Sequence, residues 1–269
     1  MTDWWQAMLL AIVQGVTEFL PVSSSAHLIL PAQILGWPDQ GLMFDVGVHA
    51  GTLLAVLYYF RVTLTRFCLS LMPGEGADRS ELWALCVATL PVVVAGFLLK
   101  EFVATYARSA LVIAIATIFF GLLLGWADRA ARHSDNRRTE IGMRDALLIG
   151  LAQMFALIPG TSRSGVTITA ALFLGYPART ATRFSFLLSI PVILGASLVM
   201  LLSVPEAHLL SSAGKILPSL VASAIFAYIT ISLFMTLVER VGLMPFVIYR
   251  LILGSVLLVW VLQIGRAHV

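Results

Sequence analysis

The sequence predicts an all-α, polytopic membrane protein with six transmembrane helices and two re-entrant helical hairpins arranged as an inverted-topology repeat. Three observations carry this prediction. The 269 residues are 59% hydrophobic and only 12% charged, which is about half the charge of a soluble domain. Six apolar stretches are long enough to span a bilayer, and two further apolar stretches are broken by proline. Parts of this pattern occur twice along the chain.

The spans follow from length. A helix needs about 20 mostly apolar residues to cross the hydrocarbon core. The stretches that qualify are 44–60, 82–100, 109–127, 183–203, 216–238 and 244–263. The stretch 7–35 is interrupted at Pro21 and the serines after it, and the stretch 146–175 at Pro159 and the sequence TSRSG. Roughly 12 residues precede each break, too few to cross, so both stretches are interpreted as re-entrant hairpins.

Lys and Arg indicate the orientation. With the N-terminus outside and the hairpins not crossing, the cytoplasmic segments hold Arg61, Arg66, Arg79, Arg129, Arg132, Arg137, Arg138, Arg144, Arg179, Arg183 and Arg240. The outer segments hold Lys100, Arg108, Lys215 and Arg266. This agrees with the positive-inside rule and places the basic loop 129–144 in the cytoplasm. The rule does not decide whether the hairpins cross, because crossing would weaken the bias only slightly.

Two segments of the chain resemble each other. LLAIVQGVTEFLPVSSSAHLI (9–29) and LLIGLAQMFALIPGTSRSGVTI (147–168) both run from an apolar helix through Gln and Pro to a serine-rich turn. Aligning their prolines places Ser24 on Ser162. Each copy would hold one hairpin and three spans, and since three is odd the second copy starts on the opposite side of the membrane. Inverted-topology folds of this kind place their site at the repeat interface, near the bilayer midplane.

The expected domain organisation is a single membrane domain over residues 1–264. One repeat covers 1–128, the other covers 145–264, and the basic loop lies between them. The last residues, 265–269 (GRAHV), differ in character from the preceding span and are interpreted as a cloning remnant. The N-terminal MTDWWQ has no basic n-region, so no cleavable signal peptide is expected.

Both broken segments predict a polar cavity, because irregular backbone at membrane depth is tolerated only where it lines a cavity or is buried in protein. A second half-helix begins near Ser24 and another near Arg163, and the free N–H groups and dipole of a first turn favour anions. The planar fork of Arg163 suits phosphate oxygens. The further predicted phosphate ligands are Ser23, Ser25, Gly160, Thr161, Ser162 and Ser164. For Ser23 and Ser25, helix packing is an equally open interpretation.

Gln14 and Glu18 are four residues apart and share one helix face. A carboxylate repels a phosphate unless a divalent cation bridges them, and Mg²⁺ commonly takes one or two carboxylates plus substrate phosphates. The expected cofactor is therefore a divalent cation, Mg²⁺ or Ca²⁺, held by Glu18 with Gln14. With the phosphate also held by Arg163, Ser24 or His27 as attacking group or base is enough for phosphoryl hydrolysis.

Four further polar residues lie in the predicted spans and hairpins, and the sequence pattern indicates their roles less clearly than those of Glu18 and Arg163. Asp45 and His49 share a face at the outer end of a span and either line an entrance or lie at the membrane interface. Arg250 is about two turns from the inner end of its helix, so it is expected to snorkel in a structural role. Gln153 is the counterpart of Gln14, but Leu157 follows it four residues later, so only the first hairpin is expected to carry a metal ligand.

The motifs QGVTEFLPVSSSAH and PGTSRSG together resemble the two signature motifs of the bacterial undecaprenyl-pyrophosphate phosphatase family, the bacitracin-resistance type. The stretches FDVGVHAGTLLAVLYYFR, ARTATRFSFLLSIPVILGAS and PFVIYR are also similar to that family, so the resemblance covers nearly the whole chain. It implies six spans and two re-entrant hairpins in inverted repeats. It also implies removal of the terminal phosphate of a C55 isoprenoid pyrophosphate, with a divalent cation, on the periplasmic side of the bacterial plasma membrane.

Carried over by position, the resemblance assigns roles to Glu18, Ser24, His27, Ser162 and Arg163. The first acidic position of the motif is Gln14 here, which still offers a carbonyl oxygen but is a weaker metal ligand. Some relatives have Thr-Gly where this chain has Ser25-Ala26, which puts in doubt any role for a flexible glycine before the histidine.

The predicted function is hydrolysis of undecaprenyl pyrophosphate for the recycling of the cell-wall carrier lipid. The expected partners are this lipid and the bilayer, with no nucleic acid and with a homodimer left open. A proton-coupled polyprenyl-phosphate transporter or flippase is the alternative, because broken helices and a buried carboxylate also suit a carrier. The sequence leaves open whether Ser24 or His27 is the nucleophile.

Overall fold

The computed structural model describes the chain except residues 1–3, 39, 73–78, 133–137, 203–212 and 268–269. The described residues form helices and no strand. Six helices are long and apolar enough to cross a membrane, which confirms the prediction of an all-α, multi-pass membrane protein. They are α3 (Leu42–Tyr59), α5 (Ser80–Tyr106), α6 (Ala110–Arg132), α9 (Ala178–Leu202), α11 (Ala213–Val241) and α12 (Met244–Ala267).

The helices beside the two breaks are shorter. They are α1 (Trp4–Thr17), α2 (Ser24–Leu35), α7 (Met143–Gln153) and α8 (Arg163–Phe173), of 14, 12, 11 and 11 residues. None reaches the length of about 20 residues that a span needs. A 3₁₀ turn, η1 (Met154–Leu157), extends α7. Pro21 and Pro159 both fall in the turns that separate these helices, where the sequence predicts the breaks.

The structure adds one helix and moves several boundaries. Helix α4 (Arg61–Ser70) follows α3 directly; it is short and polar, so a search for apolar spans does not show it. Helix α6 continues to Arg132, through the start of the predicted basic loop 129–144. Part of that loop, 133–137, lies outside the described residues, as do residues 268–269 of the predicted remnant.

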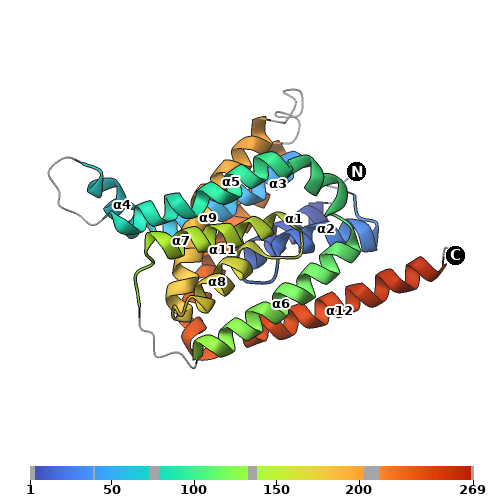
Figure 1. The fold of residues 1–269 in the computed structure, drawn as a ribbon. Helices are drawn as coiled ribbons and strands as arrows, with labels where there is room; N and C mark the ends of the chain where they lie inside the picture. Colours follow the sequence, from blue (N-terminus) through green and yellow to red (C-terminus); the bar gives the residue numbers. More distant parts are fainter. Residues whose placement is uncertain (1–3, 39, 73–78, 133–137, 203–212, 268–269) are drawn as a thin grey trace.

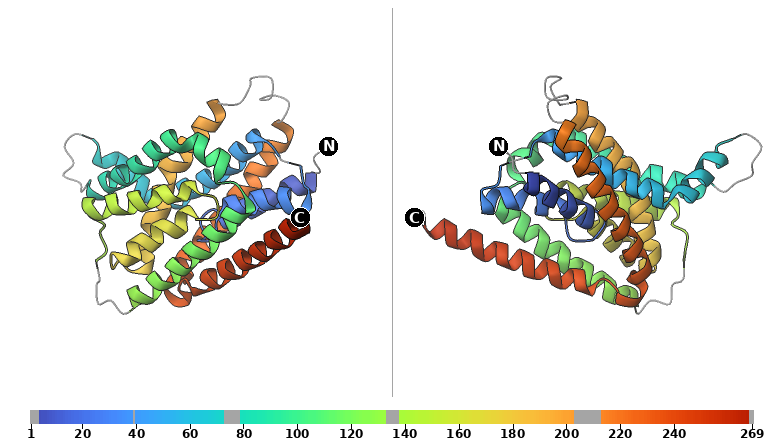
Figure 2. Two further views of the ribbon diagram at one scale, coloured as in Figure 1. Left: turned by 45° about the vertical axis from the view of Figure 1, so that its right-hand side comes forward. Right: turned by 180° about the vertical axis from the view of Figure 1, so that it is seen from behind.

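Close helix contacts hold the two short helix pairs inside the bundle. Helix α1 packs against α11 and α7 against α5, while α8 contacts α6 and α9. A Cβ atom on Gly15 would lie 2.5 Å from the carbonyl oxygen of Ser223, and one on Gly150 would lie 2.5 Å from that of Ala88. Glycine at these two positions therefore permits the approach. Helices α6 and α12 pack along one flank of the molecule (Figures 1 and 2).

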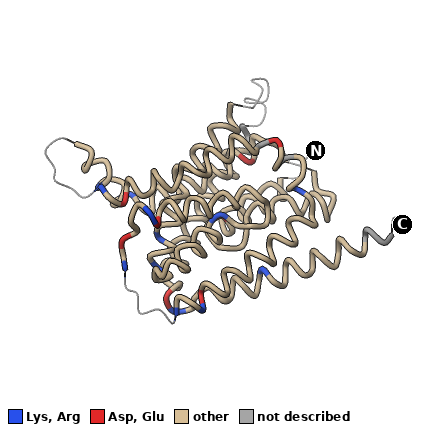
Figure 3. The backbone as a smooth tube through the Cα atoms, viewed as in Figure 1, with Lys and Arg blue, Asp and Glu red and all other residues tan. Residues whose placement is uncertain are grey.

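Most described Lys and Arg residues gather at the end of the molecule where α4 and the start of α7 lie (Figure 3). Ion pairs tie the helices together there. Arg183 pairs with Glu81 between α9 and α5, and Arg138 lies 3.2 Å from Asp145. The Tyr176 hydroxyl donates to Asp145 at 2.6 Å. Burial and this carboxylate raise the pKa of Tyr176, so the phenol remains protonated and remains a donor.

Candidate active site

A cavity of about 190 Å³ lies where the two broken segments meet, and we call it the site cavity. Its polar lining comes from Glu18, Ser23, Ser24, Ser25, His49, Ser162 and Arg163. Its apolar lining comes from Val92, Ala156, Leu157, Val192, Ile193 and Ala196, on α5, η1 and α9. The turn after α1 and the turn before α8 thus share one small polar space surrounded by apolar helices.

Glu18 and Arg163 join the two turns. The Glu18 Oε1 atom lies 3.4 Å from Arg163 Nη2, although the sequence places the residues far apart. Their side chains are only 8% and 11% exposed, respectively. Arg163 also donates from Nη1 to the carbonyl of Ser185 at 3.0 Å. A buried charge left without its partner is costly, so loss of either side chain would destabilise the other in this position.

The second carboxylate oxygen of Glu18 is a hydrogen-bond acceptor for two neighbours. The Ser24 hydroxyl donates to Oε2 at 2.7 Å, and the Gln14 amide donates to the same atom at 2.9 Å. Ser24 lines the site cavity, whereas Gln14 is fully buried behind Glu18. A serine hydroxyl that already donates to a carboxylate is oriented for transfer of its proton.

Ser23 and Ser162 both have a positive φ, of 73° and 70°, which residues other than glycine rarely adopt. They are the non-glycine residues with positive φ in the described part of the chain. Such a conformation costs about 1–3 kcal/mol per residue and is often found at functional sites. Each serine immediately precedes a helix, since α2 begins at Ser24 and α8 at Arg163.

This geometry corrects the predicted alignment. By backbone conformation Ser23, and not Ser24, is the counterpart of Ser162, so the alignment of Ser24 with Ser162 is wrong by one residue. The cause is local, because Pro21 is two residues before its strained serine and Pro159 is three residues before the other.

Several predicted phosphate ligands build the junction instead of facing the cavity. The Gly160 N–H donates to Ser23 Oγ at 3.2 Å, and the Ser164 hydroxyl donates to the carbonyl of Leu20 at 2.9 Å. Gly160 has a φ of +94°, and a Cβ atom there would lie 2.5 Å from a backbone oxygen of α6, so only glycine fits. Thr161 is fully buried and does not line the site cavity. These three residues shape the contact between the turns.

The two helix N-termini at the cavity differ. Ser162 Oγ accepts from the N–H of Gly165 at 3.1 Å and caps α8. Ser23 makes no such bond to α2, because its hydroxyl meets Gly160 and the hydroxyl of Ser25. The first turn of α2 therefore has no side-chain cap from Ser23, and its N–H groups are suited to an anion.

His27 lies behind the cavity and is not among the residues that line it. Its Nδ1 is 2.7 Å from the carbonyl oxygen of Ser23, and its Nε2 is 2.5 Å from the hydroxyl of Tyr249 on α12. A carbonyl only accepts, so Nδ1 carries the hydrogen and Nε2 of the neutral ring accepts from Tyr249. Of the two predicted nucleophiles, the structure places Ser24 at the cavity and uses His27 to hold the carbonyl of the strained Ser23.

The predicted metal ligands are an adjacent pair of oxygen donors. Gln14 Oε1 is buried and has no hydrogen-bond partner among the described residues, while Nε2 of the same amide is the atom that faces Glu18 Oε2, at 2.9 Å. Hard oxygen donors of this kind suit Mg²⁺ or Ca²⁺. The described part of the chain contains no group of three His, Cys, Asp or Glu that could hold a metal alone. The residues therefore fit a cation whose remaining ligands are substrate oxygens and water.

Arg250 on α12 has a structural role, as the sequence interpretation expected, but at a different place in the fold. The expectation that it snorkels is wrong, because the residue is 0% exposed. Its guanidinium donates to the carbonyls of Pro21 at 3.3 Å, Gly160 at 3.0 Å and Thr161 at 2.9 Å. The missing Cβ of Gly165 makes room for it, since that atom would lie 2.8 Å from Nη1. An arginine inside an apolar span was the available signal.

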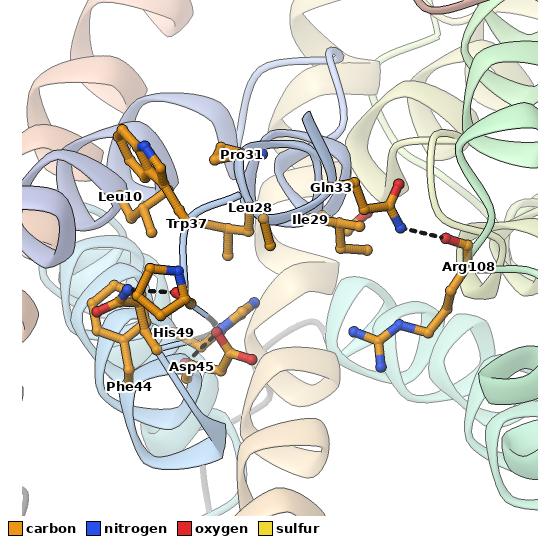
Figure 4. Close-up of a pocket in the computed structure, with 14 residues that line it drawn as sticks. Leu10, Leu28, Ile29, Pro31, Gln33, Trp37, Phe44, Asp45, His49 and Arg108 are labelled. Atoms are coloured by element: carbon orange, nitrogen blue, oxygen red, sulfur yellow. Dashed lines mark hydrogen bonds between the residues drawn. The ribbon is translucent and has the colours of Figure 1, made fainter. Parts of the chain in front are cut away.

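Asp45 and His49 lie at a second cavity, of about 360 Å³, which we call the vestibule (Figure 4). Its polar lining is Ser25, Gln33, Gln40, Asp45, His49 and Arg108. His49 lines both the vestibule and the site cavity, whereas Asp45 lines only the vestibule. This position favours the entrance interpretation of these two residues.

Comparison with known proteins gives consistent matches over nearly the whole chain. Residues 7–256 match the sequence model of a family described as bacitracin resistance protein BacA. An undecaprenyl-diphosphatase of Alcanivorax borkumensis is 54% identical over 267 residues, covering 96% of this chain and 99% of the relative. Proteins of the same name from Chromohalobacter salexigens and Hahella chejuensis are 51% and 50% identical, each covering 96% of this chain and 99% and 98% of the relative, respectively.

Proposed function

The chain belongs to the bacitracin resistance protein BacA family, and we propose that the site cavity is where it acts on its lipid substrate. The chain is an undecaprenyl-diphosphatase: it hydrolyses undecaprenyl pyrophosphate to undecaprenyl phosphate and inorganic phosphate, which recycles the carrier lipid. The observation that carries the site assignment is the contact of Glu18 with Arg163 across the two turns. It joins a carboxylate and a guanidinium cation in a cavity whose other walls include apolar side chains.

In this proposal the α1–α2 and α7–α8 pairs are re-entrant hairpins that enter from opposite faces of the membrane. Their lengths support this, and so does their packing. Helix α1 packs against α11 while α7 packs against α5, which is the exchange of partners that a two-fold repeat requires. The start of α1 and the end of α12 lie toward one end of the molecule (Figure 2). Arginines gather at the other end, which supports the proposal that the site cavity opens toward the periplasm of the bacterial plasma membrane.

The residues at the site cavity divide the reaction among them. Arg163 and the first-turn N–H groups of α2 bind the phosphate oxygens and stabilise the charge that develops in the transition state. The Ser24 oxygen attacks the terminal phosphorus and its proton passes to Glu18, to which it already donates. The anhydride bond to the prenyl phosphate breaks, and that phosphate leaves as the anion. Water then releases inorganic phosphate from Ser24.

A divalent cation, when bound, would neutralise the repulsion between Glu18 and the pyrophosphate. Glu18 and the amide oxygen of Gln14 are the residues that would hold it, with substrate oxygens completing the set.

The prenyl chain has an apolar route from the cavity. A groove of about 560 Å³ lies between α5, α6 and η1 and is lined by apolar side chains that include Leu99, Phe102, Phe155 and Leu157. Leu157 also lines the site cavity. A pyrophosphate at Arg163 can therefore have its isoprenoid tail in this groove, where apolar side chains replace the lipid tails around it.

Removal of divalent cations is expected to stop phosphate release. Purified protein in detergent would be treated with EDTA, assayed with a polyprenyl pyrophosphate, and assayed again after Mg²⁺ or Ca²⁺ is restored. The expected loss is at least about 100-fold, because the carboxylate would then repel the substrate. Full activity in EDTA would contradict the cation's role. Movement of intact lipid without hydrolysis would instead support the transporter alternative.

Ser24 and His27 are expected to differ as catalytic groups. Ser24→Ala should lower kcat by about 1,000-fold because the attacking oxygen is removed. His27→Gln should lower kcat by only about tenfold, because the ring lies behind the cavity and acts by holding the turn. Steady-state phosphate release for both variants gives the comparison. A larger loss for His27→Gln than for Ser24→Ala would reverse the assignment.

A further inference from the structure

Two routes lead away from the site cavity. Ser25 lines the site cavity, the vestibule and a connecting pocket of about 360 Å³ that also contains Leu99, Leu157 and Arg108. Leu157 continues the lining into the apolar groove. One route is therefore apolar and suits the prenyl chain. The other leads through the vestibule, where polar and apolar side chains are mixed.

Arg108 lies at the mouth of both routes. It lines the vestibule and the connecting pocket. Its backbone carbonyl accepts from the Gln33 amide at 3.2 Å, which ties the α5–α6 connection to α2. Its guanidinium forms no hydrogen bond or ion pair with the described part of the chain. Figure 4 shows it pointing into the space between its own segment and the helix that carries Asp45 and His49.

His49 is the link between the vestibule and the site cavity. Its Nδ1 is 2.7 Å from the backbone carbonyl of Asp45, so Nδ1 carries a hydrogen and Nε2 is the ring atom left for a ligand. The Asp45 residue also lines the vestibule and has an interaction of its own. Arg108 supplies the guanidinium cation of the vestibule lining.

We propose that the vestibule is a second phosphate-binding site for a phosphate group that is leaving or entering the site cavity, in which Arg108 donates to the phosphate oxygens and His49 Nε2 accepts from a P–OH group. The inference rests on the phosphatase activity. Hydrolysis produces two anions, and only one of them carries a chain that the apolar groove can hold. The other product, inorganic phosphate, is strongly hydrated and needs a polar route. The pyrophosphate head of an arriving lipid has the same chemistry and meets the same residues.

The test uses purified full-length protein, inorganic phosphate as the probe and Arg108→Gln as the variant. Loss of one charge-assisted contact should raise the inhibition constant of phosphate, or the KM for the lipid, about tenfold. The kcat should change less than about twofold, because Arg108 does not line the site cavity. Arg144→Gln, at an exposed position at the start of α7, is the matched control and should change neither constant.

The two arms identify the source of the phosphate. A higher inhibition constant with an unchanged KM assigns the vestibule to leaving inorganic phosphate, and a higher KM with an unchanged inhibition constant assigns it to the arriving head group. If Arg108→Gln matches the wild type in both constants, the vestibule site is refuted while the phosphatase stands. If the wild type releases no phosphate, the activity itself fails, and the two failures are thus distinguishable.

Discussion

Replacement of Glu18 by Gln is expected to lower phosphate release by at least about 1,000-fold, because one side chain serves three functions. The carboxylate accepts a hydrogen bond from the Ser24 hydroxyl at 2.7 Å and lies 3.4 Å from Arg163 Nη2. It is also the charged one of the two proposed metal ligands, Glu18 and Gln14. Glutamine keeps the size and an acceptor oxygen but has no charge and is a poor proton acceptor. Initial rates of phosphate release in detergent, with Mg²⁺ in excess, measure the loss.

Glu101→Gln is the matched control for this variant, because Glu101 is an exposed carboxylate on α5 that lies away from the site cavity. It should retain wild-type activity. The melting temperature of Glu18→Gln should be measured as well, since Arg163 then loses its buried partner. If Glu18→Gln hydrolyses the lipid within about tenfold of the wild type, neither proton transfer nor cation binding depends on this carboxylate.

Replacement of Arg250 by Met is expected to lower both stability and activity, although the residue does not line the site cavity. Its guanidinium is 0% exposed and donates to carbonyls of both turns. Removal of the guanidinium leaves several buried carbonyl groups without their donor, which together costs about 3 kcal/mol or more. For a chain of this size that corresponds to a fall in melting temperature of about 6 °C or more. Activity should fall with it, because Pro21 and Gly160 position the strained serines.

Arg250→Lys separates charge from geometry. Lysine keeps the charge but lacks the planar fork, so it should recover part of the stability and little of the activity. Arg240→Met, at the exposed end of α11, is the control and should behave like the wild type. If Arg250→Met has the melting temperature and the phosphate-release activity of the wild type, Arg250 does not hold the two turns in place.

The fold could be predicted from the sequence to the extent that it depends on apolar length. The six long helices and the breaks at Pro21 and Pro159 follow from the cost of leaving backbone polar groups unpaired in lipid. Helix α4 could not be found in this way, because it is short and polar and has no span signal. The residue-by-residue alignment of the two broken segments could not be predicted either. It depends on backbone torsions at Ser23 and Ser162, which residue types do not specify.

The candidate site could be predicted where a charge inside an apolar stretch marks it. Glu18 and Arg163 are such residues, and the structure places them together. Serine and histidine carry a weaker signal, because both also serve as packing and hydrogen-bonding groups within helices. The sequence therefore predicts His27 as a candidate nucleophile. In the structure both of its ring nitrogens have hydrogen-bond partners, the hydroxyl of Tyr249 and a backbone carbonyl. Arg108 lies in a connection between helices, where an arginine has no distinguishing pattern.

The most direct test of a shared site is a double-mutant cycle on Glu18 and Arg163, read as kcat/KM for release of labelled phosphate. The cycle compares Glu18→Gln, Arg163→Gln and the double variant with the wild type. If two residues act as one unit, the loss in the double variant is smaller than the product of the two single losses. The kcat/KM of the double variant should therefore lie within about tenfold of that of the less active single variant. A double variant whose loss equals the product of the two single losses would show that the two side chains act independently.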